Sequence, residues 1–375
     1  MSTNTAYQHS AHRAISDLRR GAPVIFQSHS GYAAMVKPAE QVSADSLTEL
    51  AHETLARPYL LITATRARAI GLNPKDNVVA CSILISENFG PEEILQLIGD
   101  LPMTLDPSSL TVLPETKDSV AHVVLMLMRS ARLMPAAIAS YISDDGPKTL
   151  SRWALDRGYT LVQESAVKSF EENSASLLRE AARAKLPIKA APDSEIAIFQ
   201  PKDGGTEHFV LIIQGGDKQK KPLVRIHSQC ITGDLLGSLK CDCGDQLQSA
   251  IEQMAASGGG MVVYLAQEGR DIGLVNKLRA YALQDGGLDT VEANHAIGFE
   301  TDHRFYLPAA TMLKALGHDE IKLLTNNPDK ISQIENCGIK VAERVPLEVG
   351  RNPFNERYLD VKREKTGHML DETSD

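Results

Sequence analysis

The sequence predicts an α/β (α+β) protein of two domains, each a mixed sheet packed with helices. Its 375 residues are enough for two hydrophobic cores of ordinary size. Short apolar runs of strand length alternate with amphipathic stretches of helix length in both halves. Residues 169–184 are rich in helix-forming and polar side chains, and Pro187 and Pro192 follow them. We therefore expect a domain boundary near residue 180, which gives domains over 1–180 and 181–375.

The first half opens its regular pattern with a helix and continues with strands. SADSLTELAHETLA, at 43–56, has the spacing of an amphipathic helix. PYLLITAT at 58–65 and NVVACSILIS at 77–86 are apolar runs of strand length. This order is typical of an α/β domain.

The second half alternates the same two patterns. Strands are expected at HFVLIIQ (208–214), LVRIHS (223–228), GMVVYLA (260–266) and EIKLLTN (320–326). Amphipathic helices are expected at DQLQSAIEQMAASG (245–258) and LPAATMLKALG (307–317).

Charge and composition narrow the class of partner. The net charge of −9 argues against general binding to nucleic acid or to an anionic membrane, since both require a basic face. No run of eighteen apolar residues is present, and the N-terminal residues lack the pattern of a signal peptide. Five cysteines, three of them clustered, fit a reducing compartment better than a disulfide framework. The expected location is the cytoplasm.

Cys230, Cys241 and Cys243 form the most informative pattern in the chain. Three thiolates at this spacing suit a soft, tetrahedral metal and leave its fourth position open, which is the arrangement of catalytic zinc sites. Cys81 and Cys337 are far away in sequence, so no fourth thiolate is apparent. Buried free thiols or a disulfide are the alternative interpretation.

Several polar side chains follow predicted strands. Glu268, Gly269 and Arg270 come directly after an apolar strand, where ligand sites of α/β sheets collect. A basic pocket suited to a polyphosphate is one interpretation of the nearby cations, and solvated surface charges are the other. These cations are Arg225, Lys277, Arg279, Arg304 and Lys330.

Asp302 and Arg304 lie close together in an expected loop before the helix that begins near Pro308. They form either a simple ion pair or a proton acceptor beside a group that acts on phosphate. The segment TNNPDK, from Thr325 to Lys330, offers a hydroxyl and an ammonium, although NNP is also an ordinary turn pattern.

In order along the chain, these segments resemble the GTP cyclohydrolase II family of riboflavin biosynthesis. The resemblance covers about half of the chain, from Lys185 to Leu370. The matching segments are RIHSQCITGD, LKCDCGDQL, QEGRDIGLVNKLRAYALQDGGLDTVEANHAIGF, the DHR step, LLTNNPDK and RNPFNERYLDVKREKTGHML.

The resemblance implies a site and a reaction. It implies that Cys230, Cys241 and Cys243 hold one Zn²⁺ per subunit and that Mg²⁺ accompanies the GTP. Asp302 is implied as proton acceptor, Arg304 as nucleophile toward the α-phosphate or as electrostatic stabiliser, and Tyr281 as a group near the water on zinc. The implied substrate-binding residues are Arg225, Ile226, His227, Ser228, Gln229, Gln246, Glu268, Gly269, Arg270, Thr290, Thr325 and Lys330.

The implied chemistry agrees with these residue types. Zinc activates water for attack on C8 of guanine, so formate leaves, and the basic cluster with Mg²⁺ neutralises the departing diphosphate. The implied product is 2,5-diamino-6-(5-phosphoribosylamino)pyrimidin-4-one, made by a homodimer. Gln229 departs from the glutamate expected there, which leaves open a related enzyme acting on another nucleotide or base. A non-catalytic nucleotide-binding regulator is the third interpretation.

The first half resembles a diverged 3,4-dihydroxy-2-butanone 4-phosphate synthase domain. The resemblance rests on LLITATRARAIGLN (60–73) and DSVAHVVLMLMRSARLMPAAIASYISDDG (118–146). That family's acidic metal-binding loop has no counterpart, because 18–39 contains no Asp or Glu. Its His-Thr-Glu-Ala motif is replaced by Asp118, Ser119, Val120 and Ala121. Without carboxylates Mg²⁺ has no usual ligands, so this half is expected to be an inactive, scaffolding or regulatory domain.

Overall fold

The computed structural model describes residues 3–86, 89–143, 150–202, 204–300 and 304–347, with side chains described from residue 9 onward. The chain forms two compact units, each with its own seven-stranded sheet. The first unit comprises Met1–Glu171 and Val275–Asp302, and the second comprises Glu172–Leu274 and His303–Asp375. The predicted class, two mixed sheets packed with helices, is confirmed. The domain boundary that the sequence predicts near residue 180 remains a prediction. That prediction did not assign residues 275–302 to the first unit.

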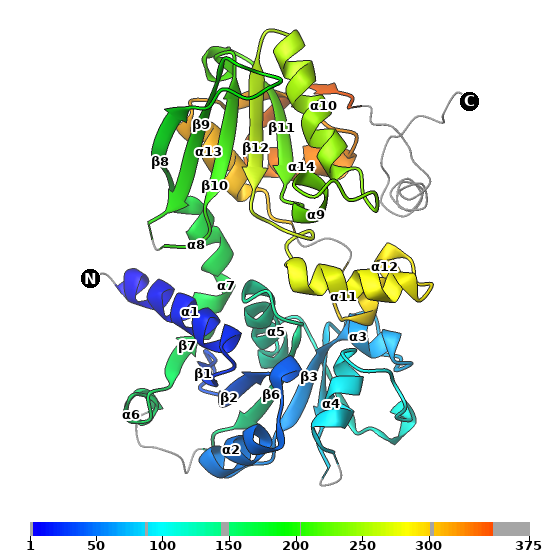
Figure 1. The fold of residues 1–375 in the computed structure, drawn as a ribbon. Helices are drawn as coiled ribbons and strands as arrows, with labels where there is room; N and C mark the ends of the chain where they lie inside the picture. Colours follow the sequence, from blue (N-terminus) through cyan, green and yellow to red (C-terminus); the bar gives the residue numbers. More distant parts are fainter. Residues whose placement is uncertain (1–2, 87–88, 144–149, 203, 301–303, 348–375) are drawn as a thin grey trace. The chain divides into compact units, whose positions relative to one another are not determined.

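The first unit has a mixed sheet of order β5-β4-β3-β6-β2-β1-β7, in which only the β1·β7 pair is parallel among the described strands (Figure 1). Its strands are β1 Val24–Gln27, β2 Ala33–Pro38, β3 Tyr59–Thr63, β4 Ala80–Leu84, β5 Val112–Glu115, β6 Ala136–Tyr141 and β7 Thr160–Gln163. Its helices are α1 Thr3–Arg19, α2 Ala44–Thr54, α3 Ala64–Ala69, α4 Pro91–Ile98, α5 Val120–Ser130, α6 Leu150–Asp156, α7 Glu164–Lys168, α11 Leu274–Asp285 and α12 Thr290–Ala296, with short 3₁₀ turns at Ala39–Gln41 and Pro107–Ser109.

Helix starts in this unit follow from local sequence. Ser43 caps α2 in a reciprocal pair with Ser46, because each side chain accepts the other residue's backbone N–H. Ser119 caps α5 by accepting the N–H of His122, so the segment 118–121 serves to start a helix. The apolar faces of α1 and α5 then pack on alternate residues of the strands, including Val24, Phe26 and Val36. The expected helix at 43–56 and strands at 58–65 and 77–86 are present, with ends shifted by one to three residues.

The second unit has a sheet of order β14-β13-β11-β12-β10-β9-β8. Its strands are β8 Leu178–Lys185, β9 Ser194–Pro201, β10 His208–Ile213, β11 Leu223–Ser228, β12 Gly260–Leu265, β13 Glu320–Leu324 and β14 Lys340–Val345. Its helices are α9 Ile231–Asp234, α10 Cys243–Ala256, α13 Leu307–Ala315 and α14 Pro328–Asn336, with a 3₁₀ turn at Gly216–Lys218. Helix α8, Phe170–Ser176, contains the point where the chain passes from the first unit to the second. The pairs β14·β13, β13·β11 and β11·β12 are parallel, and the others are antiparallel.

Strand residues of the second unit alternate between two cores. Val210 and Ile212 face a core shared with α13 and α14, while Leu211 and Ile213 face one shared with α10. This period of two is the ordinary consequence of a pleated strand buried on both faces. Figure 1 shows α10 on one face of the sheet and α13 and α14 on the other. Helices therefore pack on both faces of the sheet that ends in the carboxyl ends of β11, β12 and β13.

The helix formers of 169–184 do not continue as one helix. Helix α8 ends at Ser176, and Leu178–Lys185 pairs antiparallel with β9 as the edge strand β8. Ladder hydrogen bonds decide the conformation here against local propensity. Among the described residues, no helix has the length and apolar character needed to cross a membrane.

Candidate metal centre and nucleotide site

The candidate site lies where three neighbouring parallel strands end. In the order β13-β11-β12, the strands end at Leu324, Ser228 and Leu265. Thr325, Cys230 and Glu268 follow within three residues of these ends. Side chains that follow adjacent parallel strands meet at one edge of the sheet, which is the usual ligand-binding edge of such folds.

The three clustered cysteines converge as predicted from their spacing. The Sγ atoms of Cys230 and Cys241 are 3.7 Å apart, and the three ligand atoms all lie within 4.8 Å of one another. Zinc–sulfur bonds of about 2.3 Å at tetrahedral angles place two sulfurs about 3.8 Å apart. Cys230 and Cys241 are buried, and Cys243 is half-buried. Of the residues that the structure describes, this group alone brings three such ligands together.

Gly233 makes the convergence possible. It lies in α9, between the first ligand and the second, and is buried against the sulfurs. A Cβ atom at this position would lie 2.8 Å from the Cys241 Sγ, 3.2 Å from the Cys230 Sγ and 3.0 Å from the Cys243 Cβ. Any residue larger than glycine therefore occupies space that the thiols need.

The thiols alone form an unfavourable set of charges. The contact with Cys230 raises the pKa of the Cys241 thiol, and burial adds to this. Contacts with Cys230 and Cys241, together with burial, raise the pKa of the Cys243 thiol well above its ordinary value. Three neighbouring thiolates require a compensating cation. The sulfur set and its spacing fit a soft tetrahedral ion such as zinc.

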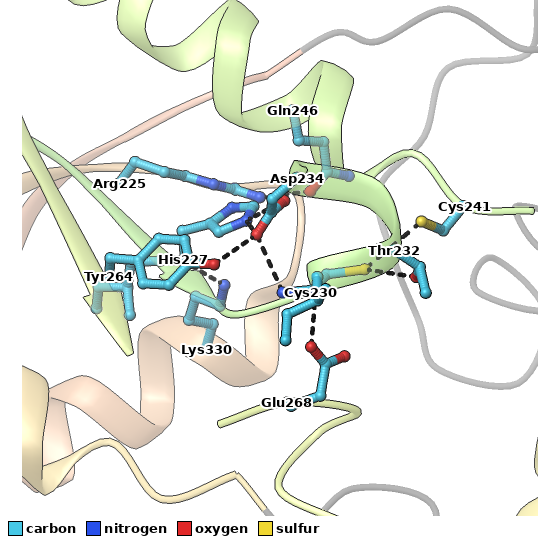
Figure 2. Close-up of polar contacts among 12 residues, drawn as sticks. Arg225, His227, Cys230, Thr232, Asp234, Cys241, Gln246, Tyr264, Glu268 and Lys330 are labelled. Atoms are coloured by element: carbon cyan, nitrogen blue, oxygen red, sulfur yellow. Dashed lines mark hydrogen bonds and ion pairs between the residues drawn. The ribbon is translucent and has the colours of Figure 1, made fainter. Parts of the chain in front are cut away.

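Asp234 organises the residues behind Cys230 (Figure 2). Its carboxylate accepts the backbone N–H of Cys230 at 3.0 Å and the hydroxyl of Tyr264 at 2.8 Å. It also bonds His227 Nε2 at 3.0 Å. Burial lowers the pKa of His227, although the carboxylate acts in the opposite direction. The carboxylate thus fixes the turn that presents the Cys230 thiol.

Glu268 holds the other side of the same turn. Its carboxylate accepts the N–H of Ile231 at 2.7 Å, and the side chain is buried. The next three residues, Gly269, Arg270 and Asp271, have φ of 64°, 60° and 74°. Two residues other than glycine in succession in the left-handed region carry backbone strain, a feature that concentrates at functional sites.

Arg225 and Gln246 connect the end of the sheet to α10. Arg225 donates to the Leu324 carbonyl at 3.0 Å and to Gln246 Oε1 at 2.5 Å, and Gln246 donates to Asp242 at 2.6 Å. Burial lowers the pKa of Arg225. Three buried polar atoms at this end of the sheet have no hydrogen-bond partner among the described residues: Arg225 Nε, Ser228 Oγ and Gln267 Oε1. Buried atoms of this kind are candidates for contacts to a ligand.

Two cations lie close to one aromatic ring. Arg304 and Lys330 place their charged groups 6.0 and 5.9 Å from the centroid of the Tyr306 ring. Lys330 is buried and donates to the Ile226 carbonyl at 2.9 Å, which fixes its ammonium beside β11. Thr325 is also buried and accepts the N–H of Asn327. The structure therefore brings two cations to one ring, and one of these cations bonds β11, the strand that leads to Cys230, in an otherwise acidic chain.

The remaining predicted residues are placed as follows. The Ile226 side chain is in the hydrophobic core, and Gln229 donates its N–H to the Leu265 carbonyl at 2.8 Å. Tyr281 on α11 and Thr290 at the start of α12 belong to the first unit. Asp302 lies outside the described residues, as does the segment RNPFNERYLDVKREKTGHML.

Sequence reasoning missed Gly233, Asp234, Tyr264 and Gln267 as parts of the site. Asp234 was visible as a carboxylate four residues after Cys230, within reach of the same helical turn. Gly233 was visible as a glycine three residues after a predicted ligand. Nothing in the local sequence identified Tyr264, because its role follows from the alignment of β12 beside β11, where it pairs with His227.

Comparison with known proteins gives one family for the second half and relatives for most of the chain. The GTP cyclohydrolase II family model matches residues 179–346. A GTP cyclohydrolase-2 from Azospirillum brasilense is 40% identical over 370 residues, which cover 96% of this chain and 93% of the relative. A GTP cyclohydrolase-2 from Escherichia coli (strain K12 / DH10B) is 51% identical over 193 residues, covering 52% of this chain and 98% of the relative.

Among solved structures, a two-domain 3,4-dihydroxy-2-butanone 4-phosphate synthase from A. baumannii matches 91% of this chain and 99% of its own. The TM-score is 0.36 and the sequence identity is 14%.

Proposed function

The chain belongs to the GTP cyclohydrolase II family, which acts on GTP in riboflavin biosynthesis, and we propose that its activity depends on zinc. The proposed products are 2,5-diamino-6-(5-phosphoribosylamino)pyrimidin-4-one, formate and diphosphate. The observation that carries the zinc dependence is the cluster of Cys230, Cys241 and Cys243, whose 3.7 Å sulfur separation agrees with tetrahedral coordination. A homodimer in the cytoplasm is proposed on the family resemblance.

In this proposal, the three cysteines hold the zinc and leave one position open. A bound zinc ion supplies Lewis-acid activation of water for hydrolysis of the guanine ring. Asp234, through the N–H of Cys230, and Glu268, through the N–H of Ile231, hold the turn that presents the first ligand. A turn fixed at both ends keeps the ligand geometry in place while substrate binds and leaves.

The nucleotide is proposed to bind beside this cluster. Arg225 Nε, Ser228 Oγ and Gln267 Oε1 offer two donors and an acceptor that the described protein atoms leave unpaired. Arg304 and Lys330 supply positive charge for the phosphates, which Mg²⁺ would accompany. We propose electrostatic stabilisation by Arg304, because a protonated guanidinium is a poor nucleophile.

Further roles are proposed from the family resemblance. Asp302 is proposed as the proton acceptor and Tyr281 as a group near the reacting water. Gln246 and Thr325 are proposed to line the nucleotide site with Gly269, Arg270 and Thr290. The first unit is proposed to lack 3,4-dihydroxy-2-butanone 4-phosphate synthase activity. Formation of dihydroxybutanone phosphate from ribulose 5-phosphate by the purified protein would overturn that last assignment.

The test uses the full chain with GTP and Mg²⁺. Formate, diphosphate and the pyrimidine product are followed by mass spectrometry, before and after zinc is stripped and restored. We expect all three products from the zinc-loaded protein and none after stripping. Cys241→Ala should lose zinc and turnover, whereas Cys337→Ala, a half-buried cysteine at the end of α14, should keep both. Full activity of the stripped protein would refute the zinc dependence.

A further inference from the structure

Helices α11 and α12 are attached to the first unit by a defined set of contacts. Although the family model that matches residues 179–346 includes both helices, they pack in the first unit with α3 and α4. The contacts come from Glu40, Thr63, Arg66, Asp100 and Arg132 on one side and from Asn276, Arg279, Ala296 and Gly298 on the other. We call this set the α11–α12 anchor.

Arg66 is the centre of the anchor. Its guanidinium donates to the Gln96 and Leu97 carbonyls of α4 at 2.8 and 2.7 Å, and to the Ala296 carbonyl of α12 at 2.5 Å. Those carbonyls are at helix C-termini, where a cation is favourable. The side chain is buried, and burial lowers its pKa to about 10, so it remains charged at neutral pH. One buried cation thus joins the ends of two helices from opposite parts of the sequence.

Two glycines allow the close approach. Gly99 has φ of 93°, and a Cβ there would lie 2.6 Å from the Ala296 carbonyl oxygen. Gly298 has φ of 86°, and its carbonyl accepts the Thr63 hydroxyl at 2.8 Å. A Cβ at Gly99 would collide with the α12 backbone, and the positive φ of Gly298 disfavours any residue other than glycine there.

The start of α11 is held by charge. Arg279 bonds Glu40 and Asp100, each at 3.1 Å, and Asn276 donates to the Arg132 carbonyl at 3.2 Å. Arg279 is thereby engaged with two carboxylates of the first half. Arg279 is one of the five cations considered in the sequence for a basic pocket, and in the structure its charge is paired with Glu40 and Asp100.

We propose that the first half of the chain positions α11 and α12 for the cyclohydrolase reaction. The two helices carry Tyr281 and Thr290, so the proposal rests on the proposed function of those residues. The E. coli relative, with 98% of its length matched by about half of this chain, has no corresponding first half. In this protein, the anchor supplies from the first half a fixed platform for that segment, which makes Glu40, Thr63, Arg66 and Asp100 positioning residues.

The test removes contacts of the α11–α12 anchor that the first half supplies, and it leaves every proposed site residue unchanged. The double variant Glu40→Gln with Asp100→Asn removes both ionic partners of Arg279. Its matched control, Glu53→Gln with Asp156→Asn, removes the partners of Arg157 and Arg152 in the same unit, which are 3.0 and 2.9 Å away. Hydrogen exchange of peptides covering 275–300, zinc content, and kcat and KM for GTP are measured for each protein.

We expect exchange in 275–300 to rise about fivefold in the anchor variant, as for two partly exposed ion pairs, with kcat falling by a similar factor. Zinc content and exchange over β11 and β12 should stay unchanged, and the control should match the parent. Unchanged exchange, or faster exchange with unaltered kcat, would overturn the proposal.

A second pair of variants tests the anchor at α12. Thr63→Val should reproduce the loss, and Thr63→Ser, which keeps the hydroxyl, should restore parental exchange and kcat. If serine fails to restore them, the hydroxyl contact is not what holds α12. If the parent protein does not turn over GTP, the proposed function is refuted instead. Hydrogen exchange of 275–300 still reports whether the first half holds α11 and α12, because this measurement does not depend on turnover.

Discussion

Gly233→Ala should disable the metal site while leaving the fold in place. The added methyl group would start 2.8 Å from the Cys241 Sγ and 3.2 Å from the Cys230 Sγ. Non-bonded contacts of this kind are comfortable at about 3.5–4.0 Å. One thiol, or the short helix that carries the glycine, must therefore move by about 0.8 Å, several times the roughly 0.2 Å tolerance of metal–ligand distances.

The magnitude follows from that displacement. Changes that merely disturb the partners of metal ligands weaken binding by about 10- to 100-fold. Displacing a ligand itself should weaken zinc binding by at least about 100-fold. The cost to folding should be smaller, about 1–3 kcal/mol, as for other overpacked sites. The substitution therefore separates metal affinity from stability.

Gly237→Ala is the matched control. It adds the same methyl group four residues later, at φ of 64° and with no atom within 4 Å of the new Cβ. It carries a backbone cost but does not reach the thiols. Zinc affinity is measured by competition with a chromogenic chelator, and coordination by the sulfur-to-cobalt charge-transfer absorption of the Co²⁺ form. A Gly233→Ala protein that binds one zinc with parental affinity would refute the steric argument.

Three further outcomes are expected. Since the pKa values of Cys241 and Cys243 are raised, both are thiols at neutral pH in the metal-free protein, so zinc binding should release protons and tighten as pH rises. A weakly buffered titration with a pH indicator measures this, and binding without proton release would contradict it. Asp234→Asn should weaken zinc binding about tenfold in the chelator assay, and an unchanged value would show that the carboxylate does not position Cys230. Arg66→Lys should lower the free energy of unfolding by about 2 kcal/mol, because the single nitrogen of an ammonium cannot reach the three carbonyls that Arg66 bonds from three separate nitrogens; equal denaturation midpoints would count against it.

Much of the second unit was predictable because its strands are short, apolar and clearly bounded. LVRIHS at 223–228 is β11 to the residue, and the helix expected at 307–317 begins at Leu307. Residues 178–185 were harder, since Ala, Arg, Glu and Lys favour a helix locally and only pairing with β9 makes them a strand. The sequence likewise contains no local sign that 275–302 packs in the first unit.

The candidate site likewise has a part that the sequence predicts and a part that it does not. Short spacing along the chain brings Cys230, Cys241 and Cys243 together, so this cluster, which could hold a metal ion, was predictable from the sequence. Arg225 and Lys330 join the candidate site because β13 lies beside β11 in the sheet, and residue spacing does not encode this strand order. The contact of Tyr264 with Asp234 depends on the alignment of two strands to within one residue.

The α11–α12 anchor also constrains how the chain can be made and cut. Arg66 and Ala296 are 230 positions apart in the sequence, and Thr63 and Gly298 are 235 apart. During synthesis, the first unit cannot complete its packing until about four-fifths of the chain has been translated. Its exposed α3 and α4 surface must wait for helices that arrive after most of the second unit. A single cut near residue 180 would separate Thr63 and Arg66 from the carbonyls of Gly298 and Ala296 that they bond, so the first-half fragment would lose these contacts.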